Sequence, residues 1–157
     1  MSDPRARVLF VCIGNSCRSQ MAEAFARALG GDVLIPASAG LAPAWGVAPD
    51  TARAMEEKNI VLRDHFPKSL QNLSRVRFDI VVNMSQRELP PIPSDGKPVR
   101  MLEWDVPDPI GMTYPEHCHV RDEIEHRVGE LIEELRQQPK PPEPPRLRGQ
   151  GSGHVPL

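Results

Sequence analysis

Residues 8–19 have the sequence VLFVCIGNSCRS, and this stretch decides the fold. It begins inside the run at residues 7–11, whose apolar side chains suit a strand buried in a parallel sheet. From Ser19 onward, apolar residues recur at three-to-four spacing until Gly30-Gly31, which is typical of an amphipathic helix with a glycine stop. The stretch therefore predicts a strand, a tight loop and a helix in direct succession.

The rest of the chain up to Gln138 continues this alternation. Further strands are expected at residues 33–40, 79–82 and 98–102, and a second helix at residues 51–58. A long closing helix is expected because one apolar stripe runs from Val120 to Leu135. The first two strands and the helix between them have the length of a βαβ unit. The order of elements predicts a three-layer α/β domain.

Charge and cysteine usage exclude several classes of protein. With 19 Lys+Arg against 21 Asp+Glu, the chain has no basic field that would hold nucleic acid or an anionic membrane. The apolar run at residues 8–13 is too short for a signal-peptide core or a membrane span, so a cytoplasmic protein is expected. Three cysteines without a paired CxxC pattern suit neither a disulfide scaffold nor a zinc site.

Proline usage places a domain boundary near Gln138. Six of the 18 prolines follow this residue, in a segment with almost no apolar side chains. Residues 1–138 are therefore predicted to form one folded domain, and residues 139–157 a disordered proline-rich tail. The tail contains a loose match to the ligands of SH3 grooves. Such matches are common by chance, so a partner for the tail is an alternative only.

The loop after the first strand is the expected ligand site, since ligands of open α/β sheets bind beyond the carboxyl ends of the strands. A strand, a tight loop and a helix direct backbone N–H groups and the positive end of the helix dipole at one point, which makes an anion site. Gly14 and Asn15 suit this loop because both tolerate left-handed backbone angles. The residues expected to bind the substrate anion are Ile13, Gly14, Asn15, Ser16, Cys17 and Ser19.

Cys12 is the predicted nucleophile of this loop. Inward amides, a helix N-terminus and Arg18 all favour its thiolate, so Cys12 is expected to be ionised at neutral pH. Arg18 offers a planar fork that fits two oxygens of an oxyanion. Ser19 can donate a hydrogen bond to the sulfur. The alternative, in which Cys12 only ends a strand and Arg18 only begins a helix, fits the Gly-Asn loop less well.

A nucleophilic cysteine also needs a proton donor for the leaving oxygen. Asp108 is the predicted donor, because Pro107 and Pro109 stiffen its loop and the loop follows the last strand. Asp105 is the rival carboxyl group, and an ordinary turn aspartate is the remaining alternative.

Three motifs point to a family: residues 8–25, Ser38-Ala39-Gly40, and WDVPDP at residues 104–109. They resemble the low-molecular-weight protein tyrosine phosphatases and the arsenate reductases that share their fold, over about residues 7–137. The resemblance implies a four-stranded parallel sheet of the low-molecular-weight phosphatase fold and a phosphocysteine intermediate. It implies no metal and no other cofactor.

The resemblance also implies roles for single residues. Cys12 would attack phosphorus in line while Arg18 and the loop amides hold the oxygens. Asp108 would protonate the leaving phenol and then activate the hydrolytic water. A hydrogen-bond network that fixes the loop would consist of Asn15, Ser19, Ser38 and His65.

Two chemistries share this fold, and the sequence has features of both. Gln20 and the stretch from His65 to Lys68-Ser69-Leu70 resemble the arsenate reductases. The thioredoxin-coupled reductases need two further relay thiols, and Ser85 and Leu89 stand at the corresponding places. We therefore predict a phosphatase, with an arsenate reductase that uses an external low-molecular-weight thiol as the alternative. A phosphate-binding module without catalysis is a minor alternative.

The predicted substrate is a phosphotyrosine protein or a small aryl phosphate. Phosphatases of this family often carry aromatic residues after the Asp-Pro step, whereas Ile110-Gly111 stand there in this chain. Trp45 is predicted to form the wall of a ring pocket, with Tyr114 as a second candidate. The alternative for Trp45 is a loop aromatic that half covers the core.

The other two cysteines have less defined roles. Cys17 is hypothesised to form a reversible disulfide with Cys12 under peroxide, which would protect Cys12 from further oxidation. A small loop residue facing the core is the alternative. Cys118 lies between two histidines, but their side chains would diverge on a helix, so no metal is expected there.

Overall fold

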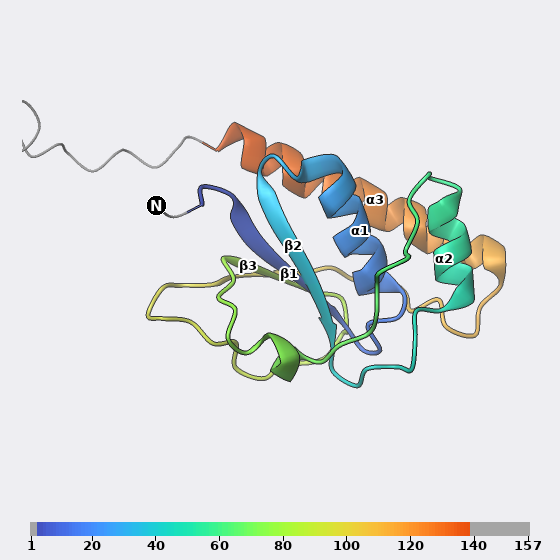
Figure 1. The fold of residues 1–157 in the computed structure, drawn as a ribbon, viewed down its shortest axis with the longest axis horizontal. Coiled ribbons are helices and arrows are strands. Elements are labelled where there is room, and N and C mark those ends of the chain that lie inside the picture. Colours follow the sequence, from blue (N-terminus) through green and yellow to red (C-terminus); the bar gives the residue numbers. More distant parts are fainter. Residues whose placement is uncertain (1–2, 139–157) are drawn as a thin grey trace, which may run out of the picture.

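Strand β1 (Ala6–Cys12) is the centre of a four-stranded parallel sheet with the order β2-β1-β3-β4. The computed structural model describes residues 3–138. The other strands are β2 (Leu34–Gly40), β3 (Ile80–Asn83) and β4 (Arg100–Glu103). The helices are α1 (Arg18–Gly30), α2 (Pro49–Glu56), the short 3₁₀ helix η1 (Leu70–Leu73) and α3 (Tyr114–Gln137). The predicted α/β class and the parallel sheet are confirmed (Figure 1).

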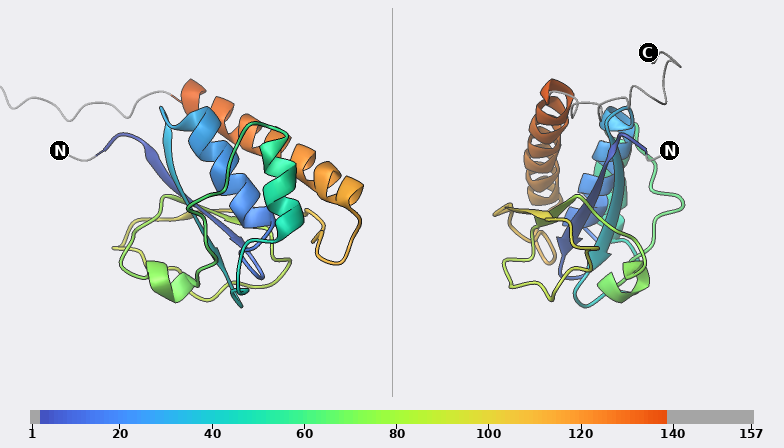
Figure 2. Two further views of the ribbon diagram at one scale, coloured as in Figure 1. Left: turned by 45° about the vertical axis from the view of Figure 1, so that its right-hand side comes forward. Right: turned by 90° about the vertical axis from the view of Figure 1, so that its left-hand side faces the viewer.

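The sheet lies between two unlike layers. Val8 and Phe10 of β1 face the layer of α1 and α3, where they pack with residues such as Phe25 and Ile124. Leu9 points to the opposite face, as strand geometry requires, and joins a smaller core that η1 and loops cover. Figure 2 shows both helices on one side of the sheet and η1 on the other. The predicted three layers are present, and the second outer layer is built from loops and η1.

The register of the sheet brings the ends of its strands together. Cys12 is paired with Gly40 at the end of β2, and Val11 with Asn83 at the end of β3. Asn83 in turn is paired with Glu103 at the end of β4. The loops that follow all four strands therefore meet at one edge, around the loop between β1 and α1.

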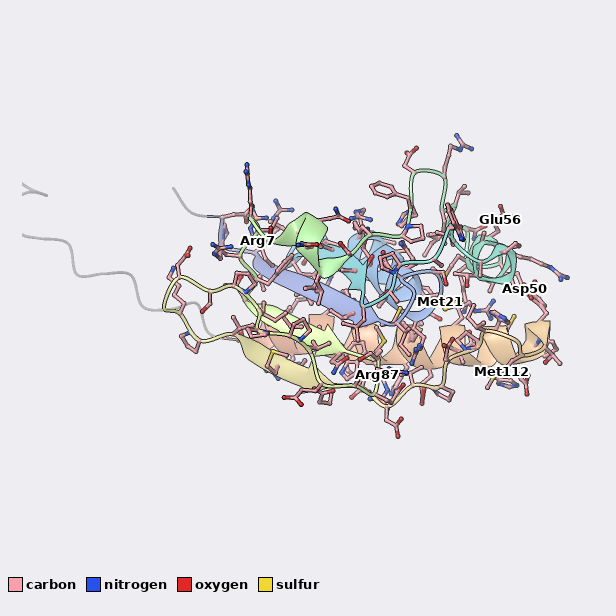
Figure 3. All side chains as sticks on the ribbon, turned by 90° about the horizontal axis from the view of Figure 1, so that it is seen from below. Arg7, Met21, Asp50, Glu56, Arg87 and Met112 are labelled. Carbon is pink, nitrogen blue, oxygen red and sulfur yellow. The ribbon has the colours of Figure 1, made fainter. Side chains whose placement is uncertain are left out.

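Helix α3 begins at Tyr114, before the predicted apolar stripe. Thr113 and Glu116 form a capping box, in which the Glu116 carboxylate accepts from the Thr113 N–H group (2.8 Å). This pattern is visible in the sequence as T-x-x-E. Figure 3 shows Met112 beside this end of α3, and α2 with Asp50 and Glu56 at the same end of the molecule.

Strand β4 forms one edge of the sheet. Arg100, Met101 and Glu103 are exposed, and only Leu102 is half-buried. No helix within residues 3–138 is long and apolar enough to cross a membrane. The predicted tail at residues 139–157 lies outside the described residues, and the boundary at residue 138 stays a prediction.

Candidate active site

The loop between β1 and α1 is held from outside by residues 41–48. Four carbonyls of the loop accept from backbone N–H groups of this segment: Cys12 from Leu41 (3.1 Å), Ile13 from Ala42 (2.8 Å), Gly14 from Ala44 (2.9 Å) and Ser16 from Ala48 (3.1 Å). In a planar trans peptide the C=O and N–H groups point in opposite directions, so the N–H groups that follow these carbonyls face the other side. With the N-terminus of α1 they form a cradle for an oxyanion.

A chain of hydrogen bonds ends on the sulfur of Cys12, which is 2% exposed. Asn15 Nδ2 donates to Ser19 Oγ over 2.7 Å, and Ser19 Oγ lies 2.8 Å from Cys12 Sγ. Because Ser19 Oγ accepts from Asn15, its own hydrogen is free to be donated to the sulfur. Ser19 therefore lies where the sequence predicted it.

Asn15 is itself held in one orientation. Its Oδ1 atom accepts from the backbone N–H group of Lys68 (2.9 Å) and from Gln20 Nε2 (3.1 Å), which leaves Nδ2 to face Ser19. Asn15 has φ 50°, in the left-handed region that asparagine tolerates better than most residues. Gln20 also donates to the carbonyl of Phe66 (3.0 Å), so it ties the loop to the segment that carries Lys68.

Arg18, the first residue of α1, is held by loops that follow two other strands. It is 1% exposed, and its Nη1 atom faces the carbonyl of Met84 (2.5 Å), Gln86 Oε1 (2.8 Å) and the carbonyl of Val106 (3.0 Å). The guanidinium is planar, so these contacts fix the direction of the whole fork. Its Nη2 atom lies 3.6 Å from Asp108 Oδ2.

Asp108 lies at the exposed rim of the site, with 43% of its side chain accessible. Its Oδ1 atom accepts from the Ile110 N–H group (3.1 Å), which leaves Oδ2 on the side of Arg18. Its rival Asp105 instead has Oδ1 3.5 Å from Gln86 Nε2. Asp108 is therefore the carboxylate in contact with Arg18, and its role as the proton donor stays a prediction.

Glu23 of α1 is buried and forms the centre of a second polar cluster. Ser38 Oγ donates to its Oε1 atom (2.5 Å), and Lys68 Nζ lies 3.7 Å from the same oxygen. Arg27 Nη1 and His65 Nε2 lie 2.8 Å and 3.7 Å from the other carboxylate oxygen. A buried carboxylate is expected to have cationic and hydroxyl partners, which Arg27, Lys68 and Ser38 supply here.

The predicted four-residue network is therefore divided into two parts. Ser19 contacts the nucleophile and Asn15 contacts Ser19, whereas Ser38 and His65 contact the Glu23 carboxylate. Lys68 joins the parts, because its backbone N–H group binds Asn15 while its ammonium lies 3.4 Å from Ser38 Oγ. Ser38 and His65 are therefore connected to the loop through Glu23 and Lys68.

His65 should make stability depend on pH. Burial lowers its pKa below the ordinary 6.5, with Arg27 and Lys68 acting in the same direction and Glu23 and Asp64 against it. The unfolded chain thus binds a proton more readily than the folded one. The contribution of His65 to the free energy of unfolding should be fully present above about pH 6.5. It should decrease as the pH falls towards the lowered pKa of the folded protein, by at most about 1.4 kcal/mol per pH unit.

Urea unfolding at a series of pH values between about 7.5 and 5 measures this slope. We expect His65→Gln, which cannot be protonated, to unfold with a shallower pH dependence than the wild type. Equal slopes in the two proteins would show that His65 does not couple folding to protonation.

Cys17 is 2% exposed, and its sulfur lies 3.8 Å from Ser16 Oγ. Burial raises the pKa of the Cys17 thiol, so it stays protonated at neutral pH and is a weak nucleophile there. This distinguishes Cys17 from the predicted role of Cys12. The disulfide between the two under peroxide stays a prediction.

Trp45 is fully exposed on the segment that holds the loop, so it does not half cover the core. Its use as a wall of the substrate pocket stays a prediction. Tyr114 is engaged elsewhere, because the Arg53 guanidinium lies 3.8 Å from its ring centroid and its hydroxyl binds Glu57. Tyr114 is therefore held against α2.

Comparisons with known proteins identify the family to which this chain belongs. The family model described as "Low molecular weight phosphotyrosine protein phosphatase" matches residues 7–140. An arsenate reductase of Bacillus anthracis is 37% identical over 126 residues, which cover 80% of this chain and 93% of the relative.

Solved structures give the same result. One described as an arsenate reductase in the phosphate binding state superposes with a TM-score of 0.74 at 32% identity, over 83% of this chain and 98% of its own. A thioredoxin-dependent arsenate reductase of Corynebacterium glutamicum superposes with a TM-score of 0.70 at 27% identity, over 87% of this chain and 64% of its own.

These relatives correct the predicted activity. The prediction of a phosphatase acting on phosphotyrosine or aryl phosphates is wrong, because the relative and the two solved structures described above are named arsenate reductases. The alternative of an arsenate reductase fits them better. The chain belongs to the low molecular weight phosphotyrosine protein phosphatase family of cysteine-based enzymes, which includes arsenate reductases.

Proposed function

We propose that this chain reduces arsenate to arsenite, with Cys12 as the nucleophile and an external low-molecular-weight thiol as the reductant. The observation that carries the proposal is the oxyanion cradle around Cys12, with Arg18 fixed beside it, in a chain whose relatives are named arsenate reductases. Arsenate has the charge and tetrahedral shape that such a cradle fits.

The first step joins the enzyme to arsenic. The Cys12 thiolate attacks As(V), an S–As bond forms, and one As–O bond breaks. The departing oxygen leaves as water. We assign its proton to Asp108, and the position of Asp108 Oδ2 beside Arg18 at the rim of the site supports this role. Arg18 and the loop amides hold the remaining arsenate oxygens.

The second step transfers the electrons. An external thiolate attacks the sulfur of Cys12, an S–S bond forms, and the S–As bond breaks with its electron pair staying on arsenic, which leaves as arsenite. A second thiol then attacks the mixed disulfide and releases the Cys12 thiolate. Two thiols are oxidised to one disulfide for each arsenate reduced by two electrons.

The reductant is proposed to be external because of where the thiols of this chain lie. Ser85 and Leu89 occupy the loop after β3 where relay cysteines would stand. Cys118 is on α3, with its sulfur 3.5 Å from Glu57 Oε2. Cys17 is the remaining thiol near Cys12, and burial keeps it protonated. The predicted cytoplasmic location would supply reduced small thiols.

The test is arsenite formation by the purified full chain with arsenate and a small thiol such as glutathione, measured beside p-nitrophenyl phosphate turnover. We expect arsenite to form well above the rate without enzyme, and faster than the aryl phosphate is hydrolysed. A parallel reaction with thioredoxin and its reductase as the only thiol source should be much slower. No arsenite with any thiol source would overturn the proposed function, and a preference for thioredoxin would overturn the external small thiol.

A further inference from the structure

Gln86 occupies a strained position in the turn that follows β3. Its φ is 58°, in the left-handed region that non-glycine residues rarely adopt. Side-chain bonds fix this turn: Asn83 Oδ1 accepts from Ser85 N (3.0 Å) and Ser85 Oγ (2.6 Å), and Asn83 Nδ2 donates to the Arg87 carbonyl (2.7 Å). The surrounding structure thus imposes the conformation, as is found where a turn carries a functional side chain.

The side-chain amide of Gln86 joins three loops. Its Oε1 atom accepts from Arg18 Nη1 (2.8 Å), while its Nε2 atom donates to the Val106 carbonyl (3.1 Å) and lies 3.5 Å from Asp105 Oδ1. Arg18 can only donate and the carbonyl can only accept, so this orientation of the amide is the one that satisfies both. The amide closes a ring with Arg18 and Val106, since Arg18 Nη1 also reaches the Val106 carbonyl (3.0 Å).

This ring fixes how Arg18 meets an oxyanion. Nη1 carries two hydrogens and already faces three protein acceptors, among them Gln86 Oε1. Because the guanidinium is planar, fixing Nη1 also fixes the orientation of Nη2, which points towards Asp108. The same amide holds the start of the loop that carries Asp108, two residues after Val106.

We propose that Gln86 is a positioning residue for the oxyanion, acting through Arg18 and the Asp108 loop. The part of the proposal that concerns arsenate as the substrate rests on the proposed function. The part that concerns oxyanion binding depends only on the cradle. A glutamine suits this role because it accepts from Arg18 and donates to Val106 at once. A glutamate could not donate to the carbonyl, and it would place a further negative charge beside Arg18.

The test compares wild type, Gln86→Ala and Gln86→Glu, with Gln71→Ala as the matched control because Gln71 is an exposed glutamine of η1. Two quantities are measured: the Kd of inorganic phosphate by calorimetry, and kcat and KM for arsenate. We expect both Kd and KM to rise about tenfold in Gln86→Ala, because Arg18 is then held less firmly in the direction that binds the oxyanion. Gln86→Glu should bind more weakly still, and kcat should change by less than about threefold in Gln86→Ala.

Unchanged Kd and KM in Gln86→Ala would overturn the proposal, including when its melting temperature falls, since that outcome describes a purely structural residue. If Gln86→Ala does not fold, Gln86→Met keeps the volume without a donor or acceptor, and the same comparison applies. A wild type that binds phosphate but makes no arsenite would overturn the proposed function only. The phosphate Kd values would then still decide the role of Gln86.

Discussion

Replacing Cys12 by serine is expected to lower arsenate reduction at least about 1,000-fold. A serine hydroxyl at this buried place is a poor nucleophile at neutral pH. Any ester that it formed with arsenic could not be resolved by a thiol either, because oxygen cannot form the disulfide that transfers the electrons. Arsenite release from the purified Cys12→Ser variant, with saturating small thiol, measures the loss.

Cys118→Ser is the matched control for this substitution. It makes the same atomic change on α3, where the sulfur contacts Glu57 outside the cradle, and should keep the wild-type rate. If Cys12→Ser kept its activity while Cys17→Ser lost it, the nucleophile would be Cys17 and the assignment of Cys12 would fail.

The second large effect is expected from Gly40→Ala, which adds a single methyl group. Gly40 ends β2 beside Cys12, and an added Cβ would lie 2.7 Å from the Ile13 carbonyl oxygen and 2.9 Å from the Asn15 nitrogen. These atoms belong to the backbone of the cradle, so the loop itself must shift. A displacement of this kind is expected to lower kcat/KM about 100-fold, and the crowding to cost about 1–3 kcal/mol of folding free energy.

Steady-state kinetics and urea unfolding of the Gly40→Ala variant measure the two effects. Gly46→Ala is the control, because an added Cβ there meets nothing within 4 Å. If Gly40→Ala kept the wild-type kcat and KM, the cradle would tolerate this displacement. The close approach of Gly40 to the backbone of Ile13 and Asn15 would then not be needed for catalysis.

Most of the fold could be predicted because its signals are local. The apolar run of β1, the glycine stop after α1 and the stripe of α3 each depend on neighbouring residues only. The start of α3 at Tyr114 was missed although the T-x-x-E capping pattern is visible, because the apolar stripe begins later. The faces of the sheet could not be assigned, since which loops cover Leu9 and its neighbours depends on contacts between distant segments.

Part of the site was predictable for the same reason. Cys12, Asn15 and Ser19 lie within one loop, and their hydrogen bonds follow its short geometry. Glu23 was missed because its partners Ser38 and Lys68 come from other segments. The signal in the sequence that could have identified Glu23 is its charge among the small and apolar residues of α1.

Gln86 and the reaction were harder to predict. The role of Gln86 depends on a turn whose side chain reaches Arg18, 68 positions away in the chain. The choice between the two chemistries failed because both need the same cradle. The absence of relay thiols at Ser85 and Leu89 argues only against the thioredoxin-coupled reductases, since a reductase supplied with an external thiol does not need them.

The exposed strand β4 has a consequence for how molecules of this enzyme meet each other. An unpaired edge can template a strand from another molecule, which leads to aggregation. Strand β4 is only four residues long and carries the charged residues Arg100 and Glu103 at its two ends. Arg100 is also paired with Glu134 of α3, so its side chain is directed to the helix that covers this face of the sheet. Short length and charge together oppose growth of the sheet beyond its four strands.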